Sequence, residues 1–404
     1  MDPEALTHLL SPTGWTLLGS LPPYDPAVAD RISDRLRKEG FEPALVAAVL
    51  TQSRLRTKAR AKLADFADGM LFTPEGLEQA TRLVVAARHA QRYRDAGATK
   101  VADLTCGLGV DSLAFAGVGL SVLAVEIDEL TAALATVNLR HFPDAEVQHA
   151  DSLAVDLEHQ GVDALFADPA RRTRSGARRH DPSAYSPSLD AVLALRERIP
   201  ALGVKVGPGI PHRDLPADAE AQWVSVDGDV VEAGLWFGPL APEGPGRSAL
   251  VLATRTTDGA DVTAHEIRGT GTTPRLAPSG PLGGYLSEPD GAVIRSGLVA
   301  EVADRVGGRL VDPSIAYVTT DERPSDPLLT TYRVLDDLPF GVKRLRAYLR
   351  DHDVGRVTIK KRGTAVVPEE LRGRLALKGA AEATVVLTRV AGAQRALVVE
   401  PVSP

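Results

Sequence analysis

Cysteine and long apolar runs are what this sequence most clearly lacks. Cys106 is the only cysteine among 404 residues, which excludes an internal disulfide framework and a cysteine-based metal site. No stretch approaches the roughly twenty consecutive apolar residues of a membrane-spanning helix. The first residues, Met1-Asp-Pro-Glu, carry neither the basic segment nor the apolar core of a signal peptide. These absences predict a cytoplasmic protein with no membrane partner, and the sequence nominates no metal ligands.

A surplus of basic residues is also missing. Lys and Arg number 46 against 53 Asp and Glu, which gives a formal net charge of −7. This balance argues against a broadly basic coat for nonspecific nucleic-acid binding, although it leaves room for a local basic patch. The apolar content of 44% and the charged content of 25% are typical of a globular protein. At about 150 residues per domain, the length predicts roughly two to four domains.

The stretch Val101-Ala-Asp-Leu-Thr-Cys-Gly-Leu-Gly-Val-Asp111 organises the expected fold. Residues 101–104 form an apolar run typical of a buried strand, Gly107 and Gly109 mark a turn, and residues 112–118 form an apolar helical run. Strand, glycine turn and helix make the first unit of a doubly wound α/β sheet, in which ligands bind at the carboxyl ends of the strands. The glycines allow the backbone to approach such a ligand closely.

The residues around this turn indicate which ligand it holds. A dinucleotide fingerprint requires a third glycine where this chain has Ser112. Asp103 ends the strand and Asp111 follows the turn, and two carboxylates repel a pyrophosphate but attract a cation. S-adenosylmethionine (SAM) carries an ammonium and a sulfonium group and no phosphate, so it suits this turn better than NAD. The alternative interpretation is an ordinary strand–helix turn with helix-capping acids.

The next two strands predict a nucleoside site. Residues 121–125 form the second strand, and Glu126 follows it, where a carboxylate accepts hydrogen bonds from both ribose hydroxyls. NAD enzymes use the same device, so Glu126 indicates a nucleoside rather than SAM itself. The third strand, 145–149, is followed by Asp151-Ser152. This pair is interpreted either as part of the nucleoside site or, equally well, as a helix N-cap.

The fourth strand, 162–167, ends in Asp168-Pro169-Ala170-Arg171. Methyl transfer from a sulfonium is a direct displacement that needs alignment more than a strong base. At this strand end, the Asp168 carboxylate can accept hydrogen bonds from an amine and so direct the lone pair of the amine nitrogen at the methyl group. Arg171 can stack on a base or hold a phosphate, and Tyr185 can supply an aromatic ring. The alternative is a simple strand-ending turn.

These patterns together resemble the class I SAM-dependent methyltransferases. The glycine turn is similar to their motif I, and the fourth-strand segment to the Asp/Asn-Pro-Pro-aromatic motif of methyltransferases that act on exocyclic amines, with Ala170 and Arg171 as departures. The resemblance implies a Rossmann-like seven-stranded sheet, SAM as cofactor, and Asp168 with Pro169 as the catalytic residues. It also places Ile127 against the adenine. The expected cofactor-binding residues are Asp103, Thr105, Cys106, Gly107, Gly109, Asp111, Glu126, Ile127, Asp151 and Ser152.

Residues 1–95 are predicted to be helical, with helices at 28–38, 43–50 and 54–66. Thr73-Pro74 is a good start for a further helix over 75–93. A similar Thr-Pro-Glu segment closes over SAM in the trimethylguanosine-synthase-like branch of the methyltransferases. That resemblance implies a pocket role for Phe72, Thr73, Gln79 and Thr81, and the alternative is helix capping and packing.

A basic loop follows the fourth strand and contains five arginines between positions 171 and 179. At the carboxyl edge of the sheet it is a candidate substrate loop, with Arg171, Arg172 and Tyr185 as binding residues, or else a solvated flexible loop. Further along, 223–226 and 231–237 predict a hairpin. Such a hairpin matches the antiparallel pair that closes class I methyltransferase sheets.

The sequence therefore divides into four expected parts. An N-terminal helical region, 1–95, precedes a methyltransferase core, 96–255. A connecting segment, 256–330, is expected to pack on that core through a helix that starts within 285–299. The last part, 331–404, has the element order βαβαββ of a small ferredoxin-like α+β module.

This last part makes the chain similar to bacterial methyltransferases with a THUMP-like domain, and the segment Ile359-Lys-Lys-Arg-Gly363 contributes to the resemblance. THUMP modules proper bind RNA, so the resemblance implies an RNA partner. It makes Lys360, Lys361, Arg362 and Lys378 candidates for phosphate contacts, with a solvated strand end as the alternative.

The favoured hypothesis is a SAM-dependent methyltransferase that methylates a nitrogen of an RNA base. Two alternatives stay open. One is a small-molecule methyltransferase in which Arg171 and Arg172 hold a carboxylate, and the other is a noncatalytic RNA-binding protein that retains SAM. The oligomeric state is not predictable from the sequence.

Overall fold

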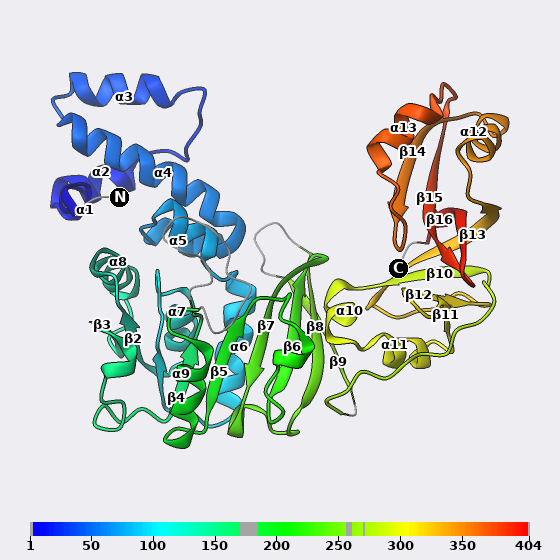
Figure 1. Ribbon diagram of the computed structural model, residues 1–404. Helices are drawn as coiled ribbons and strands as arrows, with labels where there is room; N and C mark the ends of the chain where they lie inside the picture. Colours follow the sequence, from blue (N-terminus) through cyan, green and yellow to red (C-terminus); the bar gives the residue numbers. More distant parts are fainter. Residues whose placement is uncertain (1–2, 170–184, 256–260, 270, 403–404) are drawn as a thin grey trace. The chain divides into compact units, whose positions relative to one another are not determined.

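The computed structural model describes residues 3–169, 185–255, 261–269 and 271–402. The chain forms two compact units (Figure 1). The first comprises residues 1–219 with 233–244 and 254–263, and the second comprises 220–232, 245–253 and 264–404. Within the described ranges, no helix combines the length and the apolar character needed to cross a membrane.

Helices dominate the first 95 residues, as predicted. They are α1 Pro3–Leu10, α2 Pro12–Ser20, α3 Ala29–Lys38, α4 Pro43–Leu63, α5 Pro74–Gln79 and α6 Leu83–Asp95. The predicted break between residues 50 and 54 is wrong, because α4 is continuous. Gln52 is buried there and both ends of its side chain amide bond the backbone of Phe72, with N···O distances of 2.8 and 3.0 Å. The polar segment that predicts a helix break is therefore part of the helix, and its Gln52 holds the backbone of Phe72.

The predicted helix over 75–93 is divided in two. Thr73 caps α5 as expected, since its side chain accepts a hydrogen bond from the N–H of Gly76. The chain then leaves the helix at Ala80 and re-enters it at Leu83. The Lys62 ammonium bonds the carbonyls of Leu77, Glu78 and Ala80, so carbonyls freed at the end of α5 find a cation instead of a further helical turn.

A nine-stranded sheet follows. Its strands are β1 Lys100–Asp103, β2 Ser121–Glu126, β3 Ala145–His149, β4 Ala164–Ala167, β5 Leu202–Val206, β6 Glu220–Val226, β7 Asp229–Trp236, β8 Gly246–Thr254 and β9 Val262–Arg268. The strand order is β3-β2-β1-β4-β5-β7-β6-β8-β9. The first five strands pair in parallel and β7 runs antiparallel to β5. This confirms the doubly wound α/β fold with a hairpin after the fifth strand, and β8 and β9 extend the sheet beyond the seven strands expected.

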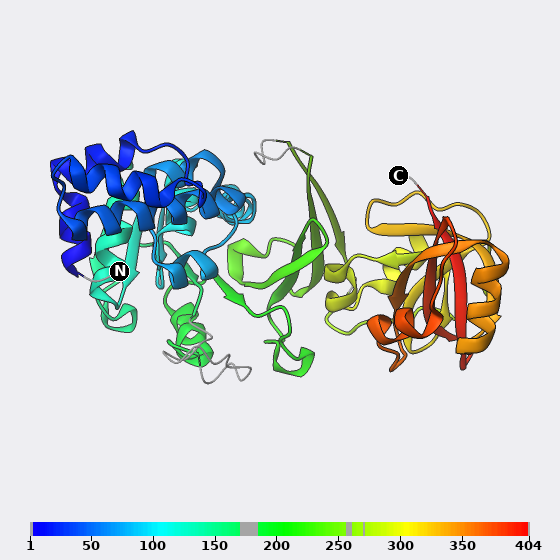
Figure 2. The ribbon, with the colours of Figure 1, turned by 90° about the horizontal axis from the view of Figure 1, so that it is seen from above.

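The helices between these strands are α7 Val110–Gly117, α8 Glu129–Leu139 and α9 Leu189–Ala194. Both faces of the sheet are apolar because β1, β2, β4 and β5 are buried along almost their whole length. Helix α6 packs against α7, and one continuous core joins the N-terminal helices to the sheet. The N-terminal helices and the sheet of the first unit are seen from above in Figure 2.

The second sheet has seven strands: β10 Tyr285–Pro289, β11 Arg309–Asp312, β12 Ile315–Thr320, β13 Leu329–Pro339, β14 Val354–Lys361, β15 Ala381–Val390 and β16 Ala393–Pro401. Their order is β11-β12-β10-β13-β16-β15-β14. The accompanying helices are α10 Gly291–Ser296, α11 Val299–Arg305, α12 Val342–Asp351 and α13 Pro368–Leu375. From β13 onward the order is βαβαββ, as the sequence predicts.

Residues 285–320 differ from expectation. The pattern over 285–299 predicts the start of a helix, whereas 285–289 form strand β10, which pairs with β12 and β13. Most of the connecting segment therefore joins the C-terminal sheet. Helix α10 does pack on β6, where the Ser225 hydroxyl donates to the Asp290 carboxylate at 2.7 Å.

Candidate active site

The glycine turn after β1 is shaped for a close backbone approach. Gly107 and Gly109 have φ values of 54° and 81°, in the left-handed region that favours glycine. A Cβ on Gly109 would lie 3.3 Å from the Leu139 side chain, whereas a Cβ on Gly107 would meet no atom within 4 Å. Gly109 is thus constrained by packing against α8, and Gly107 faces open space.

Asp103 lies behind this turn and is 1% exposed. It accepts a 2.6 Å hydrogen bond from the Ser112 hydroxyl, the residue found where a dinucleotide fingerprint has glycine. Burial raises the pKa of Asp103 to about 7, with a contribution from the nearby negative charge of Asp111, and the hydrogen bonds from Ser112 and the N–H of Thr105 oppose the rise. Asp103 therefore titrates near neutral pH.

Glu126 and Ile127 occupy the expected place at the end of β2. The two Glu126 carboxylate oxygens accept the N–H groups of Gly107 and Asp128, at 3.0 and 2.9 Å. Each carboxylate oxygen has a second lone pair, so Glu126 can also accept hydroxyl groups. Ile127 is 68% exposed, which leaves its apolar surface available to a flat ligand.

Three other predicted cofactor residues have structural roles. Asp151 caps the short helix Ser152–Ala154 by accepting the N–H of Leu153 at 3.0 Å, the alternative that the sequence left open. Ser152 is buried, and Cys106 is 8% exposed, where burial raises the pKa of its thiol far above the ordinary value. Cys106 is therefore a small packing residue of the turn.

Asp168 follows β4 directly and is held from two sides. Its N–H donates a 2.7 Å hydrogen bond to the Thr105 hydroxyl, which ties the end of β4 to the glycine turn. Its Oδ2 lies 2.5 Å from the Lys205 ammonium. Within the described part of the chain, its Oδ1 has no hydrogen-bond partner, and the side chain is 24% exposed. Pro169, the next residue, is buried.

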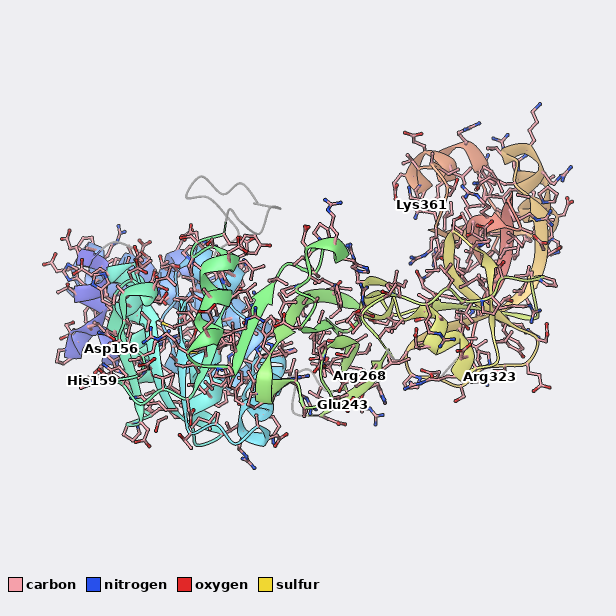
Figure 3. All side chains as sticks on the ribbon, turned by 60° about the horizontal axis from the view of Figure 1, so that its bottom comes forward. Asp156, His159, Glu243, Arg268, Arg323 and Lys361 are labelled. Atoms are coloured by element: carbon pink, nitrogen blue, oxygen red, sulfur yellow. The ribbon has the colours of Figure 1, made fainter. Side chains whose placement is uncertain are left out.

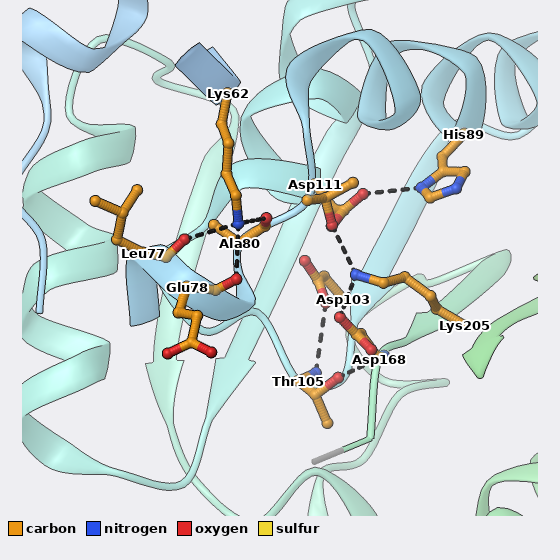
Figure 4. Close-up of polar contacts among 11 residues, drawn as sticks. Lys62, Leu77, Glu78, Ala80, His89, Asp103, Thr105, Asp111, Asp168 and Lys205 are labelled. Atoms are coloured by element: carbon orange, nitrogen blue, oxygen red, sulfur yellow. Dashed lines mark hydrogen bonds and ion pairs between the residues drawn. The ribbon is translucent and has the colours of Figure 1, made fainter. Parts of the chain in front are cut away.

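Lys205 connects Asp168 to a buried network (Figure 4). Its ammonium also donates to the Thr81 hydroxyl at 2.8 Å, and that hydroxyl donates to Asp111 Oδ2 at 2.6 Å. Asp111 Oδ1 is bonded to the Nδ1 of His89 at 2.9 Å. Burial alone would raise the pKa of Asp111, but the His89 hydrogen bond and the charges of His89 and Lys205 outweigh it and lower the pKa. Asp111 is thus an ionised member of the network rather than an exposed cofactor ligand.

Lys205 and His89 were not among the predicted site residues. A lone lysine in the apolar strand Leu-Gly-Val-Lys-Val is the signal that could have identified Lys205, since a buried ammonium needs a partner. His89 has no comparable signal, because its helix brings it to Asp111 only in the folded chain.

The four N-terminal candidates separate into one site residue and three others, of which Thr73 is the cap of α5. Thr81 belongs to the network. Phe72 is fully buried in the core, so its predicted pocket role is corrected to packing, and Gln79 is exposed at the end of α5. Lys62 donates hydrogen bonds to the carbonyls at the end of α5. Burial, together with the nearby charge of Lys205, lowers the pKa of Lys62 to about 8.

The remaining candidates contribute less. Arg171 and Arg172 lie outside the described residues. Tyr185 is 6% exposed, which leaves little ring surface for stacking on a base. In the second unit, Glu288 is paired with Lys360 and Arg362.

The residues at this edge fit SAM. Gly107 leaves open space above a turn whose neighbours include the exposed Ile127 face and the carboxylates of Glu126 and Asp103. Apolar contact, hydroxyl acceptors and negative charge are what an adenosine that carries a sulfonium and an ammonium requires.

Comparison with known proteins identifies the family. The THUMP domain-like family matches residues 329–401, and a domain of unknown function (DUF8688) matches residues 2–59. A crystal structure of a proposed methyltransferase from Porphyromonas gingivalis shares the fold, with a TM-score of 0.74 at 23% identity and coverage of 100% of both chains.

Two curated Mycobacterium tuberculosis proteins, each described as an uncharacterized S-adenosylmethionine-dependent methyltransferase, are 35% identical to the chain over 346 residues. The match covers 83% of this chain and 90% of each relative. This similarity, together with the glycine turn and the strand-end acids, shows that the chain belongs to the S-adenosylmethionine-dependent methyltransferases and carries a C-terminal THUMP domain-like module.

Proposed function

We propose that this methyltransferase methylates a nitrogen of an RNA base, with Asp168 as the residue that orients the acceptor. The observation that carries the proposal is the arrangement of the Asp168 carboxylate. Lys205 occupies Oδ2, while Oδ1 has no partner among the described residues at an edge that fits SAM. A fixed carboxylate with one free oxygen is suited to accept an N–H bond from an amine.

SAM, when bound, supplies an electrophilic methyl group on its sulfonium. The chain positions the groups around it: Gly107 gives backbone access, Glu126 accepts hydroxyl groups and Asp103 contributes negative charge. Asp168 Oδ1 accepts an N–H of the acceptor and so directs the nitrogen lone pair. Alignment of this kind is the main requirement of a direct displacement. The Thr105 hydroxyl fixes the Asp168 backbone against the cofactor turn, so the two parts of the site are aligned with each other.

RNA as the substrate is supported by the charge of the THUMP domain-like module. Residues 329–401 contain 14 Lys and Arg against 8 Asp and Glu, whereas the whole chain has 46 against 53. The module therefore carries a surplus of cations, although the chain as a whole carries a surplus of anions. Lys361, labelled in Figure 3, is one of its exposed basic residues. A local basic surface of this kind is suited to phosphates.

Helix α12 concentrates this charge. Leu345 and Leu349 face the core, and the helix also carries the basic residues Lys343, Arg344, Arg346 and Arg350. Among the described residues, no carboxylate lies within ion-pair distance of these four side chains. Arg346 and Arg350 donate to the carbonyls of Arg374 and Ala376 at the end of α13, which leaves Lys343 and Arg344 as the exposed cations without a bonding partner.

Methyl incorporation from labelled SAM tests the proposal. Total RNA, protein and small-metabolite fractions are each incubated with the full-length enzyme and labelled SAM. We expect label in the RNA fraction, in a methylated base after nuclease digestion. Label only in small metabolites would replace RNA by a small-molecule acceptor. SAM binding without any transfer would indicate a noncatalytic protein.

A further inference from the structure

Lys205 has a position that the sheet itself determines. Strands β4 and β5 pair in parallel, with Phe166 opposite Gly203 and Ala167 opposite Val204. The next step of this register brings Asp168 beside Lys205. The other residues of β5 are apolar and buried, and Lys205 is itself only 5% exposed. The pairing of β4 with β5 therefore places the Lys205 side chain next to Asp168, the residue that follows β4.

The contacts of Lys205 fix the direction of the Asp168 carboxylate. The ammonium bonds one carboxylate oxygen of Asp168, and through Thr81 it is linked to the ionised Asp111. Two carboxylates thus flank one buried ammonium, an arrangement that offsets the cost of burying its charge. Because Thr105 holds the Asp168 backbone and Lys205 holds Oδ2, little freedom of rotation remains for Oδ1.

We propose that Lys205 is a positioning residue for methyl transfer, which holds Asp168 Oδ2 so that Oδ1 faces the acceptor nitrogen. This inference rests on the proposed role of Asp168. Lys205 acts through Asp168 and does not bind the substrate, since its side chain is 6% exposed while that of Asp168 is 24% exposed. We also assign it no contact with the cofactor, since its buried ammonium is bonded to Asp168 and Thr81.

The test compares Lys205→Met, Lys205→Arg and Lys100→Met. Methionine keeps the length and apolar body of lysine but loses its charge. Arginine keeps the charge and the ability to bond a carboxylate. Lys100 is a matched control, because it is a partly buried lysine of the same sheet that donates to the Gln160 carbonyl at the opposite end of β1. Single-turnover rates and kcat and KM for RNA are measured alongside SAM affinity and thermal melting.

We expect Lys205→Met to lower kcat about 100-fold, the effect of a misplacement of about 1 Å, with KM for RNA and Kd for SAM within about threefold of wild type. Lys205→Arg is expected to restore kcat to within about tenfold, and Lys100→Met to match wild type. An unchanged kcat in Lys205→Met would overturn the inference. A parallel loss of melting temperature and SAM binding in both Lys205 variants would also overturn it, because that result describes a structural counter-ion.

A readout without turnover separates this inference from the proposed function. In a crystal structure of Lys205→Met with adenosylhomocysteine, the Asp168 carboxylate is expected to leave its present orientation. If wild type transfers no methyl group to RNA, the proposed function fails, and the crystal structure still decides the role of Lys205. An Asp168 carboxylate that is unmoved in Lys205→Met would contradict the inference on its own.

Discussion

Two clusters of mixed charge lie in different units of this protein, and they differ in what they leave unsatisfied. In the first unit, Lys205 is shared by Asp168 and Thr81, and one Asp168 oxygen has no partner in the described residues. In the second unit, both Glu288 oxygens are bonded, by Lys360 at 2.8 Å and Arg362 at 3.0 Å. Of the two carboxylates, Asp168 alone has an oxygen with no bonding partner among the residues that the structure describes.

The surroundings of the two clusters sharpen the difference. Lys360 lies over the Tyr332 ring and Arg362 over the Tyr317 ring, so the second cluster is closed by aromatic faces as well as by charge. Phosphate contacts predicted for Lys360 and Arg362 would therefore compete with Glu288. The comparison teaches that a charged cluster indicates a candidate site where a carboxylate oxygen remains unbonded, and a structural link where both carboxylate oxygens are bonded.

The largest effect is expected at Asp168. Asp168→Ala removes the free acceptor, and we expect methyl transfer to RNA to fall about 1,000-fold while SAM affinity stays near wild type, because alignment and not cofactor binding is lost. Labelled-methyl assays and calorimetry measure the two quantities. Asp156→Ala serves as the control, since the Asp156 carboxylate, labelled in Figure 3, accepts the N–H of His159 and has no bond to Asp168, Lys205 or Thr105. Equal activity of Asp168→Ala and wild type would remove the distinction between the two clusters.

A smaller effect is expected on the basic helix of the module. The double variant Lys343→Glu, Arg344→Glu should weaken RNA binding about 30-fold at low salt and flatten the dependence of affinity on salt, because each lost phosphate contact removes counterion release. Arg333→Glu is the control, since Arg333 is an exposed cation already paired with Glu400. Filter binding at several salt concentrations gives the slopes. Identical slopes for the double variant and the control would argue against α12 as the RNA surface.

The titration of Asp103 provides a third test. With a pKa raised to about 7, Asp103 loses its proton between about pH 6 and pH 8, and the ionised form attracts the positive groups of SAM. SAM affinity should therefore rise about tenfold over that range, and Asp103→Asn should abolish the rise.

The effect of pH on the free energy of unfolding has the opposite sign. A raised pKa favours the protonated folded state, so this contribution is present at low pH and is lost as the pH rises through about 7. Calorimetry and chemical unfolding at each pH check both statements.

The smallest effect is expected at Glu288. Glu288→Gln should lower the free energy of unfolding by about 1 kcal/mol, between the values for exposed and buried ion pairs, and leave methyl transfer unchanged. Burial alone would raise the pKa of Glu288, but the hydrogen bonds and charges of Lys360 and Arg362 outweigh burial and lower this pKa. Its stabilising contribution is thus present above the ordinary pKa of 4.5 and lost as the pH falls below it. Urea unfolding at neutral and acidic pH measures this, and an acid profile shared by variant and wild type would contradict it.

Local sequence patterns predicted much of this fold because they act over short distances. The glycine turn, the acid at the end of β2 and the capping role of Thr73 depend on neighbouring residues alone. The Lys205–Asp168 pair depends on the alignment of two strands separated by a long insertion. The buried place of Phe72 depends on Gln52 from another helix. Such contacts have no periodic signal, so they emerge only when the chain is folded.

The gap between α5 and α6 has a consequence for dividing this enzyme. Thr81 and His89 precede position 96, where the sequence suggests that the catalytic core begins, yet both bond Asp111. Lys62, further upstream, secures the carbonyls on the approach to Thr81. A shortened protein that starts at the first strand would keep every recognisable methyltransferase motif and still lose the partners that neutralise its interior carboxylates, so the smallest autonomous enzyme is larger than its motifs suggest.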